Sequence, residues 1–322
     1  MAGELDVVVD PGPADFSALE AAAPANPFYS RHFAAAMAET GNTPCILRLS
    51  DGAGALVGCV GFIRSGRLSR SLQITSVPRL GQANGAFWTG VKAYCARTGV
   101  TDLVVQSFGS SESTIPAVGT ETSRDKRVEF VLDLDGRDPW ERLDKKHRQS
   151  ITKCRQHEVQ VEQTADPAAA DEHAALMGLS LDRHKTRGEN VAANVDVDTL
   201  RALLRHGAAT LYRATLDGQV LSSASVLRSV TGAYYHTAGN HPDGLTLGTS
   251  HLLLYEISRR LTSEGAAEFN FGGTQPTNEG LVRFKTRFGT RRVDLEAASF
   301  DLGSRWRRAL IAASRELRGA LR

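Results

Sequence analysis

The chain has 322 residues, of which 41% are hydrophobic and 23% charged, and its formal net charge is +2. This is the composition of a globular protein with one large domain or two ordinary ones, and the balance of charge does not indicate a nucleic-acid binder. The N-terminal MAGELDVVVD lacks the basic residues of a signal peptide, and no apolar run approaches the ~18 residues of a membrane span. We therefore expect a cytoplasmic protein.

The first half of the sequence alternates between strand and helix patterns. Apolar and β-branched runs predict strands over 6–10, 44–49, 55–63, 72–77, 101–107 and 127–134. Helices are predicted over 14–23, 30–40 and 82–97. Ser30 is a candidate N-cap, Gly99 a candidate C-terminal cap, and Asp51-Gly52 a hairpin turn. The Ser/Thr/Gly-rich stretch 109–124 predicts a loop.

The second half repeats this alternation with more basic residues. Helices are predicted over 140–156, 167–185, 197–206 and 304–321, and strands over 159–162, 209–216, 219–228, 232–239, 268–271 and 292–300. Asp217-Gly218 predicts a hairpin turn. Leu247 to Ser250 opens a long amphipathic helix, and a short basic helix ends at Gly289.

Two segments that each follow a long helix resemble one another. Residues 99–109 and 265–273 both contain a helix-ending Gly, an acid three residues later, an apolar strand and a Gly turn. Their first glycines are 265 − 99 = 166 positions apart, about half the chain. We therefore predict two copies of one mixed α/β unit, an N-terminal lobe over 1–136 and a C-terminal lobe over 137–322.

The four cysteines give no sign of a metal or redox site. Cys45, Cys59, Cys95 and Cys154 show no Cys-x-x-Cys spacing and no neighbouring cluster of histidines. We expect them to be buried as small hydrophobic residues in a reducing compartment, and we expect no metal.

Three stretches carry a resemblance to a known family. The C-terminal block is the most specific: FNFGG over 269–273, followed by EGLVRFKTRFG over 279–289. The basic run KHRQSITKCR over 146–155 and NPFYS over 26–30 support it. Together they resemble the FemABX-like branch of the Gcn5-related N-acyltransferase superfamily, over most of the chain. The resemblance implies an α/β fold with a mixed sheet, built from two tandem Gcn5-related lobes.

The resemblance also implies acyl transfer without a tightly bound cofactor. Members of the branch move an aminoacyl group from aminoacyl-tRNA to an amine, often on a peptidoglycan precursor, and this donor is our first expectation. The turn Leu247-Gly248-Thr249 lacks the full Gln/Arg-x-x-Gly-x-Gly loop of acetyl-CoA enzymes. The alternatives are an acyl-CoA-dependent N-acyltransferase acting on a saccharide or small amine, and a non-catalytic protein that binds nucleic acid or a partner.

Amide formation requires a stabilised oxyanion and a neutral amine. The resemblance places Lys285 at the reacting carbonyl; the alternative is a solvated lysine on an amphipathic helix. His236 is a candidate proton relay because its free pKa is near neutrality, and a structural role is the alternative. Glu279 and Asp243 are rival bases, and an amine that arrives neutral needs none.

The donor and any nucleic acid require positive groups. At the helix start, Gly248, Thr249 and Ser250 are expected to hold donor phosphate together with Asn240, or simply to cap the helix. Arg283 and Arg287 are candidate phosphate clamps. A further basic set is expected to contact the phosphates of tRNA or of an anionic acceptor, unless it is a solvated helix face: Lys145, Lys146, Arg148 and Arg155.

Overall fold

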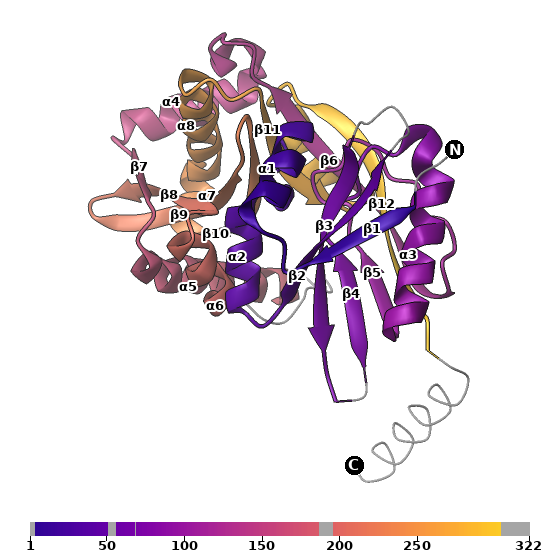
Figure 1. Cartoon of the computed structure of the whole chain (residues 1–322). Helices are drawn as coiled ribbons and strands as arrows, with labels where there is room; N and C mark the ends of the chain where they lie inside the picture. The colour runs from indigo at the N-terminus through magenta and orange to yellow at the C-terminus, as the bar shows by residue number, and fades with distance from the viewer. Residues whose placement is uncertain (1–3, 51–55, 68, 187–195, 304–322) are drawn as a thin grey trace.

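The computed structural model describes residues 4–50, 56–67, 69–186 and 196–303. Within these residues the strands form one mixed sheet in the order β1-β2-β3-β4-β5-β12-β6-β11-β10-β9-β8-β7. In Figure 1 the strands of the first half lie to the right and those of the second half to the left, with β12 in yellow beside β6 between them. The helices pack against this sheet and against one another.

The elements of the first half are short strands joined by helices and hairpins. The strands are β1 (Leu5–Val9), β2 (Thr43–Ser50), β3 (Leu56–Ser65), β4 (Arg70–Ile74), β5 (Asp102–Val105) and β6 (Thr120–Asp133). The helices are α1 (Pro13–Ala22), η1 (Pro27–Tyr29), α2 (Arg31–Glu39), η2 (Gly81–Ala83) and α3 (Asn84–Thr98).

The second half has the same alternation. Its strands are β7 (Gln160–Thr164), β8 (Ala209–Leu216), β9 (Gln219–Arg228), β10 (Gly232–Asn240), β11 (Glu268–Thr274) and β12 (Arg291–Asp301). Its helices are η3 (Pro139–Arg142), α4 (Lys145–Gln156), η4 (Pro167–Ala169), α5 (Ala170–Thr186), α6 (Val197–Arg205), α7 (Pro242–Leu247), α8 (Thr249–Ser263) and α9 (Glu279–Thr286).

Each half contains one pair of parallel strands joined by a helical crossover. In the first half β4 pairs with β5 through α3, and in the second β10 pairs with β11 through α7 and α8. The last strand of each half pairs with a strand of the other half: β6 pairs with β11, and β12 pairs with β5. β6 and β12 also pair with each other, so the two halves share one continuous sheet. The lobe boundary at 136 stays a prediction.

Local sequence patterns correctly predicted several helix ends and one hairpin turn. The Ser30 hydroxyl accepts a hydrogen bond from Phe33 N at 3.1 Å and caps α2, and Gly99 ends α3 at φ 70°. Asp217 and Gly218 have φ values of 50° and 80°, as a tight hairpin turn requires. The four cysteines are buried and unpaired, as predicted. Burial raises the pKa of Cys45 and of Cys95 to about 12, so both thiols stay protonated.

Other boundaries differ because distant contacts decide them. β6 begins at Thr120 instead of 127, because its polar first half pairs with β12. The helix predicted over 140–156 is divided at Asp144, whose carboxylate accepts from His147 N and caps α4. Helix α7 was not predicted; Pro242 begins it. The predicted turn Asp51-Gly52 and the helix predicted over 304–321 lie outside the described residues.

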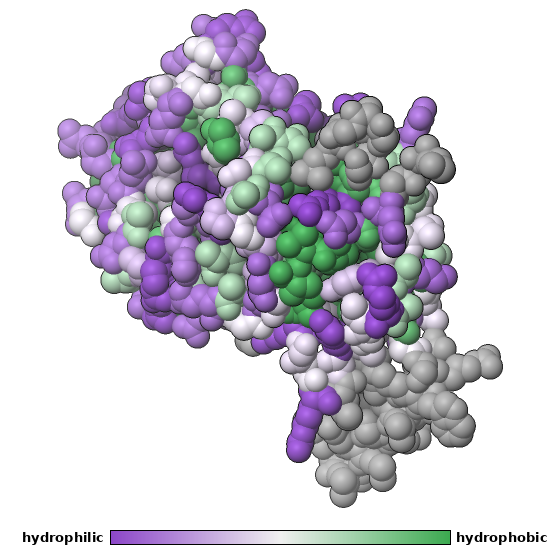
Figure 2. Space-filling view, in the orientation of Figure 1, coloured by the Kyte–Doolittle hydropathy of each residue, from purple (hydrophilic) through white to green (hydrophobic). Residues whose placement is uncertain are grey.

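Two large clusters of buried side chains and one small one form the core of the described residues. The largest is centred in the first half around Phe28, Phe33 and Phe62 and extends to residues of the second half such as Leu203, and the next lies mainly in the second half around Phe269 and Phe271. Figure 2 shows a largely hydrophilic surface over the second half and a hydrophobic area beside the first-half strands. In the described part of the chain, no helix combines the length and apolar character needed to cross a bilayer.

Gly239 and Gly178 form a matched pair for testing how closely β10 packs on α5. A Cβ on Gly239 would lie 2.4 Å from Met177 N, whereas one on Gly178 would meet nothing within 4 Å. We expect Gly239→Ala to lower the free energy of unfolding by about 1–3 kcal/mol. Gly178→Ala, inside helix α5, should leave it unchanged or raise it by up to about 1 kcal/mol. Urea denaturation measures both, and equal effects would contradict the packing described.

Candidate functional site

The parallel strands β10 and β11 separate after a short pairing, and a cavity opens between them. They pair only between Gly232–Tyr234 and Glu268–Asn270. Beyond this point lies a cavity of about 410 Å³. It is lined by residues from β10, β11, α5, α9, β6 and the segment after β5: Phe108, Arg127, Ser180, Arg183, Tyr234, Tyr235, His236, Thr237, Ala238, Asn240, Phe271, Gly272, Gly273, Leu281 and Lys285.

Lys285 lies in this cavity and not on the solvated face of α9. The residue is 4% exposed, and its Nζ donates to Gly272 O at 2.9 Å and to Gly273 O at 3.2 Å. Burial lowers the pKa of Lys285 to about 7; the charge of Glu129 opposes this shift and that of Arg127 adds to it. When Lys285 is protonated, these two carbonyls accept two of its three N–H bonds.

His236 forms a bulge in β10 beside the cavity. Tyr235 and Thr237 pair with Val226 and Ser225, which are consecutive, so His236 is the extra residue. Its Nδ1 is shielded from solvent and has no hydrogen-bond partner among the described residues. Burial lowers the pKa of His236 to about 4, so the ring is neutral at pH 7 and only weakly basic.

A buried carboxylate that sequence reasoning missed lies beside Lys285. Glu129 is 0% exposed. It accepts four hydrogen bonds, from Gly109 N at 3.0 Å, Arg127 Nη2 at 2.7 Å, Tyr234 OH at 2.8 Å and Asn270 Nδ2 at 2.7 Å. These donors replace the water that the carboxylate loses on burial. The one sequence signal was an acid in the apolar run of β6, at a position facing inward.

Arg127, two residues earlier on the same strand, was missed as well. Its guanidinium lies 4.0 Å from the centre of the Phe108 ring, and its Nη1 donates to Gln106 O at 3.2 Å. It pairs with Glu129 at 2.7 Å, and the charges of both residues act on the pKa of Lys285. The cavity therefore suits a ligand that is polar or gains negative charge.

The predicted donor residues at the start of α8 form one hydrogen-bonded cluster. Ser250 Oγ donates to Asn240 Oδ1 at 2.6 Å, and Ser222 Oγ donates to the same atom at 2.7 Å. The Thr249 hydroxyl is fully buried and donates to Gly244 O at 3.1 Å, while Gly248 adopts φ 88° before the helix. Asn240 alone of the four predicted residues lines the cavity. Their donor-binding role stays a prediction.

The two predicted arginine clamps do not line the cavity. Arg283 is exposed on α9. Arg287 forms an ion pair with Asp144, Nε to Oδ2 at 3.0 Å, and its carbonyl accepts from Asp144 N. This pairing fixes the end of α9 to the start of α4, which is a structural task. A clamp role for either residue remains untested.

The basic residues of α4 lie apart from the cavity. Lys145 and Arg148 line a separate groove of about 540 Å³ along this helix, and Lys146 is exposed. Arg148 donates to Glu141 O at 3.0 Å, and Arg155 pairs with Glu256 at 3.0 Å. Neither lysine forms an ion pair within the part of the chain that the structure describes. The lysines are thus the better candidates for phosphate contacts.

Residues 142–286 match the family model described as an acetyltransferase (GNAT) domain. The match lies within the second half of the chain and extends over less than half of its 322 residues. No curated protein matches the sequence. Among solved structures, FemX is similar with a TM-score of 0.66 and 11% identity, over 91% of this chain and 96% of that one. L-PGS from Bacillus licheniformis is similar with a TM-score of 0.52 and 13% identity, over 97% and 98%.

These comparisons confirm the predicted fold class and the family resemblance. A conserved protein of unknown function from Bacteroides thetaiotaomicron is also similar, with a TM-score of 0.53 and 10% identity, over 91% of this chain and 99% of that one. At such identities the structural similarity shows the fold. Since the similarity to FemX extends over 91% of the chain, both halves of the chain take part in it.

Replacing Glu129 tests how strongly the buried carboxylate stabilises the fold. Glu129→Gln leaves Arg127 without its charged partner, so we expect the free energy of unfolding to fall by about 3–5 kcal/mol. Glu121 is a matched control on the same strand, because its pair with Arg124 is solvent-exposed. Glu121→Gln should change stability by less than about 1 kcal/mol. Equal losses in the two variants would show that the Glu129 network contributes no special stability.

The shifted pKa of Lys285 predicts a pH-dependent stability. Its pKa is about 7 when folded and near the ordinary 10.5 when unfolded, so between these values unfolding takes up a proton. The destabilisation is absent above pH 10.5, grows as the pH falls and is complete below about 7. From pH 7 to 9 the residue should thus add up to about 1.4 kcal/mol of stability per pH unit. Urea titrations of Lys285→Met should lack this slope; parallel curves for both proteins would refute the shift.

Proposed function

We propose that the protein is an acyltransferase that forms an amide bond, and that the cavity between β10 and β11 holds the reacting carbonyl. The observation that carries this proposal is Lys285, buried in the cavity with two N–H bonds used by Gly272 and Gly273. A buried ammonium held by two carbonyls has a fixed position, so its remaining N–H can be aimed at a developing oxyanion. The GNAT domain assignment supports acyl transfer.

The reaction is the attack of an amine nitrogen on an ester or thioester carbonyl. The C–N bond forms, the carbonyl oxygen becomes an oxyanion, and Lys285 donates to it. The C–O or C–S bond of the donor then breaks, the amine loses a proton, and the leaving oxygen or sulfur is protonated. One oxyanion-hole donor supplies about 2.7–4 kcal/mol to such a step. His236, neutral at pH 7, is proposed as the relay for the amine proton.

Aminoacyl-tRNA is the proposed donor, with an amine on a small molecule or cell-wall precursor as acceptor. Support comes from the FemABX-like sequence blocks and from the similarity to FemX over 91% of the chain. Lys145 and Lys146 on α4 are the proposed contacts for tRNA phosphates, because they are exposed and lack acidic partners among the described residues. A protein that bound tRNA or a partner without chemistry would show no turnover.

An acyl-CoA donor is the second candidate, with a saccharide or small amine as acceptor. The matched family model is described as an acetyltransferase domain, and α8 begins at a glycine with φ 88° and no side-chain cap. The backbone N–H groups of such a helix start suit a pyrophosphate.

Replacing Lys285 tests the proposed oxyanion donor. Lys285→Ala should retain the fold and lose about 10²–10³ in kcat, the loss measured when one oxyanion-hole donor is removed. Lys92→Ala, an exposed lysine on α3 outside the cavity, is the control and should match the wild type. Circular dichroism checks the fold, and single-turnover rates measure the chemistry. Wild-type turnover in Lys285→Ala would remove this lysine from the mechanism.

The donor is tested with labelled acyl groups on charged tRNA and on CoA. We expect transfer from aminoacyl-tRNA, abolished by RNase and weakened steeply by added salt. Lys145→Gln with Lys146→Gln should reduce the salt dependence, while Lys92→Gln should not. Transfer from CoA thioesters that survives RNase would replace the first donor by the second, and no transfer from either would end the enzyme proposal.

A further inference from the structure

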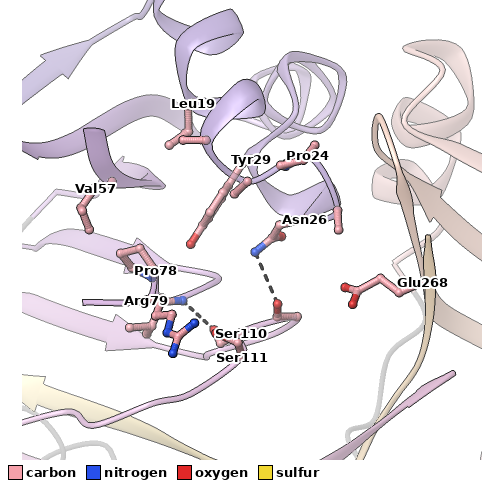
Figure 3. A pocket seen from close by; sticks show the side chains of 16 residues that line it. Leu19, Pro24, Asn26, Tyr29, Val57, Pro78, Arg79, Ser110, Ser111 and Glu268 are labelled. Atoms are coloured by element: carbon pink, nitrogen blue, oxygen red, sulfur yellow. Dashed lines mark hydrogen bonds between the residues drawn. The ribbon is translucent and has the colours of Figure 1, made fainter. Parts of the chain in front are cut away.

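A second cavity lies at the end of the other pair of parallel strands. β4 and β5 pair over Ser71–Ile74 and Asp102–Val105, and Phe108 N still donates to Thr75 O at 2.8 Å. The two segments then separate around a cavity of about 360 Å³, shown in Figure 3. It occupies the place in the first half that the Lys285 cavity occupies in the second. Open α/β sheets bind ligands beyond the carboxyl ends of parallel strands.

The walls of this cavity are mostly apolar. Leu19 and Ala22 come from α1, Val57 from β3, and Val77 and Pro78 from the segment after β4. Figure 3 shows Leu19, Val57 and Pro78 on the same side of the cavity. Moving an apolar ligand from water into this cavity is favourable in free energy, because apolar surface is removed from water.

Hydrogen bonds hold the frame of the cavity in place without a ligand. Asn26 Nδ2 donates to Ser76 Oγ at 2.7 Å, and Tyr29 OH donates to Ser76 O at 3.3 Å. Val77 N donates to Ser110 Oγ at 2.8 Å, one of the bonds drawn in Figure 3. These bonds join three segments that are distant in sequence. The cavity is therefore preformed, which lowers the entropy that binding would cost.

The charge at the rim selects the ligand. Arg79 is exposed at one side and forms no ion pair within the described residues. Glu268 lies at the opposite side in Figure 3, where it shares Arg291 with Asp133, at 3.3 Å and 3.1 Å. The cationic group left for a ligand is thus the Arg79 guanidinium, whose planar fork matches a carboxylate.

We propose that this first-half cavity binds a small organic carboxylate, with the carboxylate at Arg79 and an apolar body against Leu19, Val57 and Pro78. The site is separate from the Lys285 cavity, and its occupation requires no acyl transfer. Since Glu268 belongs to β11, the bound molecule would contact both halves of the chain.

The test compares three acids with their amides, using the full chain and isothermal titration calorimetry. The probes are 4-methylpentanoate, phenylacetate and N-acetyl-leucine, each beside its carboxamide, which has nearly the same shape without the charge. We expect at least one acid to bind at least tenfold more tightly than its amide. No binding by any acid, or equal binding of acid and amide, would overturn the proposal.

Substitutions show whether the acid binds in the first-half cavity. Arg79→Gln should weaken the acid at least tenfold, and Arg97→Gln, an exposed arginine on α3, should leave it unchanged. Ala22→Trp, which fills the cavity, should abolish binding. This variant serves as the test if Arg79→Gln is poorly folded. Lys285→Ala should bind as the wild type does. Wild-type affinity in both Arg79→Gln and Ala22→Trp, or loss in Lys285→Ala alone, would place the ligand elsewhere and contradict the proposal.

Discussion

The buried carboxylate of Glu129 is the interaction on which the rest of the site depends. A carboxylate moved out of water is costly unless donors surround it, and here four of them converge on its two oxygens. They come from the segment after β5, from β6 itself, from β10 and from β11. The four donors are therefore fixed relative to one another. Their positions also fix the cavity between β10 and β11 in which the Lys285 side chain lies.

The exchange of last strands explains why one carboxylate can reach both halves. β6 comes early in the chain but pairs with β11, and β12 returns to pair with β5. The segment after β5 is thereby brought against the second-half cavity: Phe108 lines that cavity, while Gly109 and Ser110 line the other. The two cavities share this segment as a common wall, and Gly109 N is bonded to Glu129 within it.

Local features of the fold were predictable from the sequence. Ser30, Gly99 and the Asp217-Gly218 turn act through neighbouring residues, so their patterns were sufficient. The start of β6 was not, because its polar residues are ordered by pairing with β12, about 170 positions later in the chain. The division of the helix at Asp144 likewise depends on a contact with Arg287.

The candidate site was predictable in part. The family blocks placed Lys285 near a carbonyl, His236 and Asn240 were named from their residue types, and the structure puts all three around one cavity. Glu129 was missed because its hydrogen-bond donors Tyr234 and Asn270 lie more than 100 positions away in the sequence. Arg127 was missed with it, because Arg127 acts on the site through its pair with Glu129. Arg287 looked available in the sequence but is paired with Asp144.

The central claim is that the Lys285 ammonium lies at the oxygen of the reacting carbonyl. The most direct measurement is a crystal structure with an adenosine 3′-aminoalkylphosphonate, in which a tetrahedral phosphorus replaces the carbonyl carbon of an aminoacyl ester. We expect a phosphonate oxygen about 2.7–3.1 Å from Lys285 Nζ, with the contacts to Gly272 and Gly273 retained. A phosphonate bound outside the β10–β11 cavity, with Lys285 out of its reach, would contradict it.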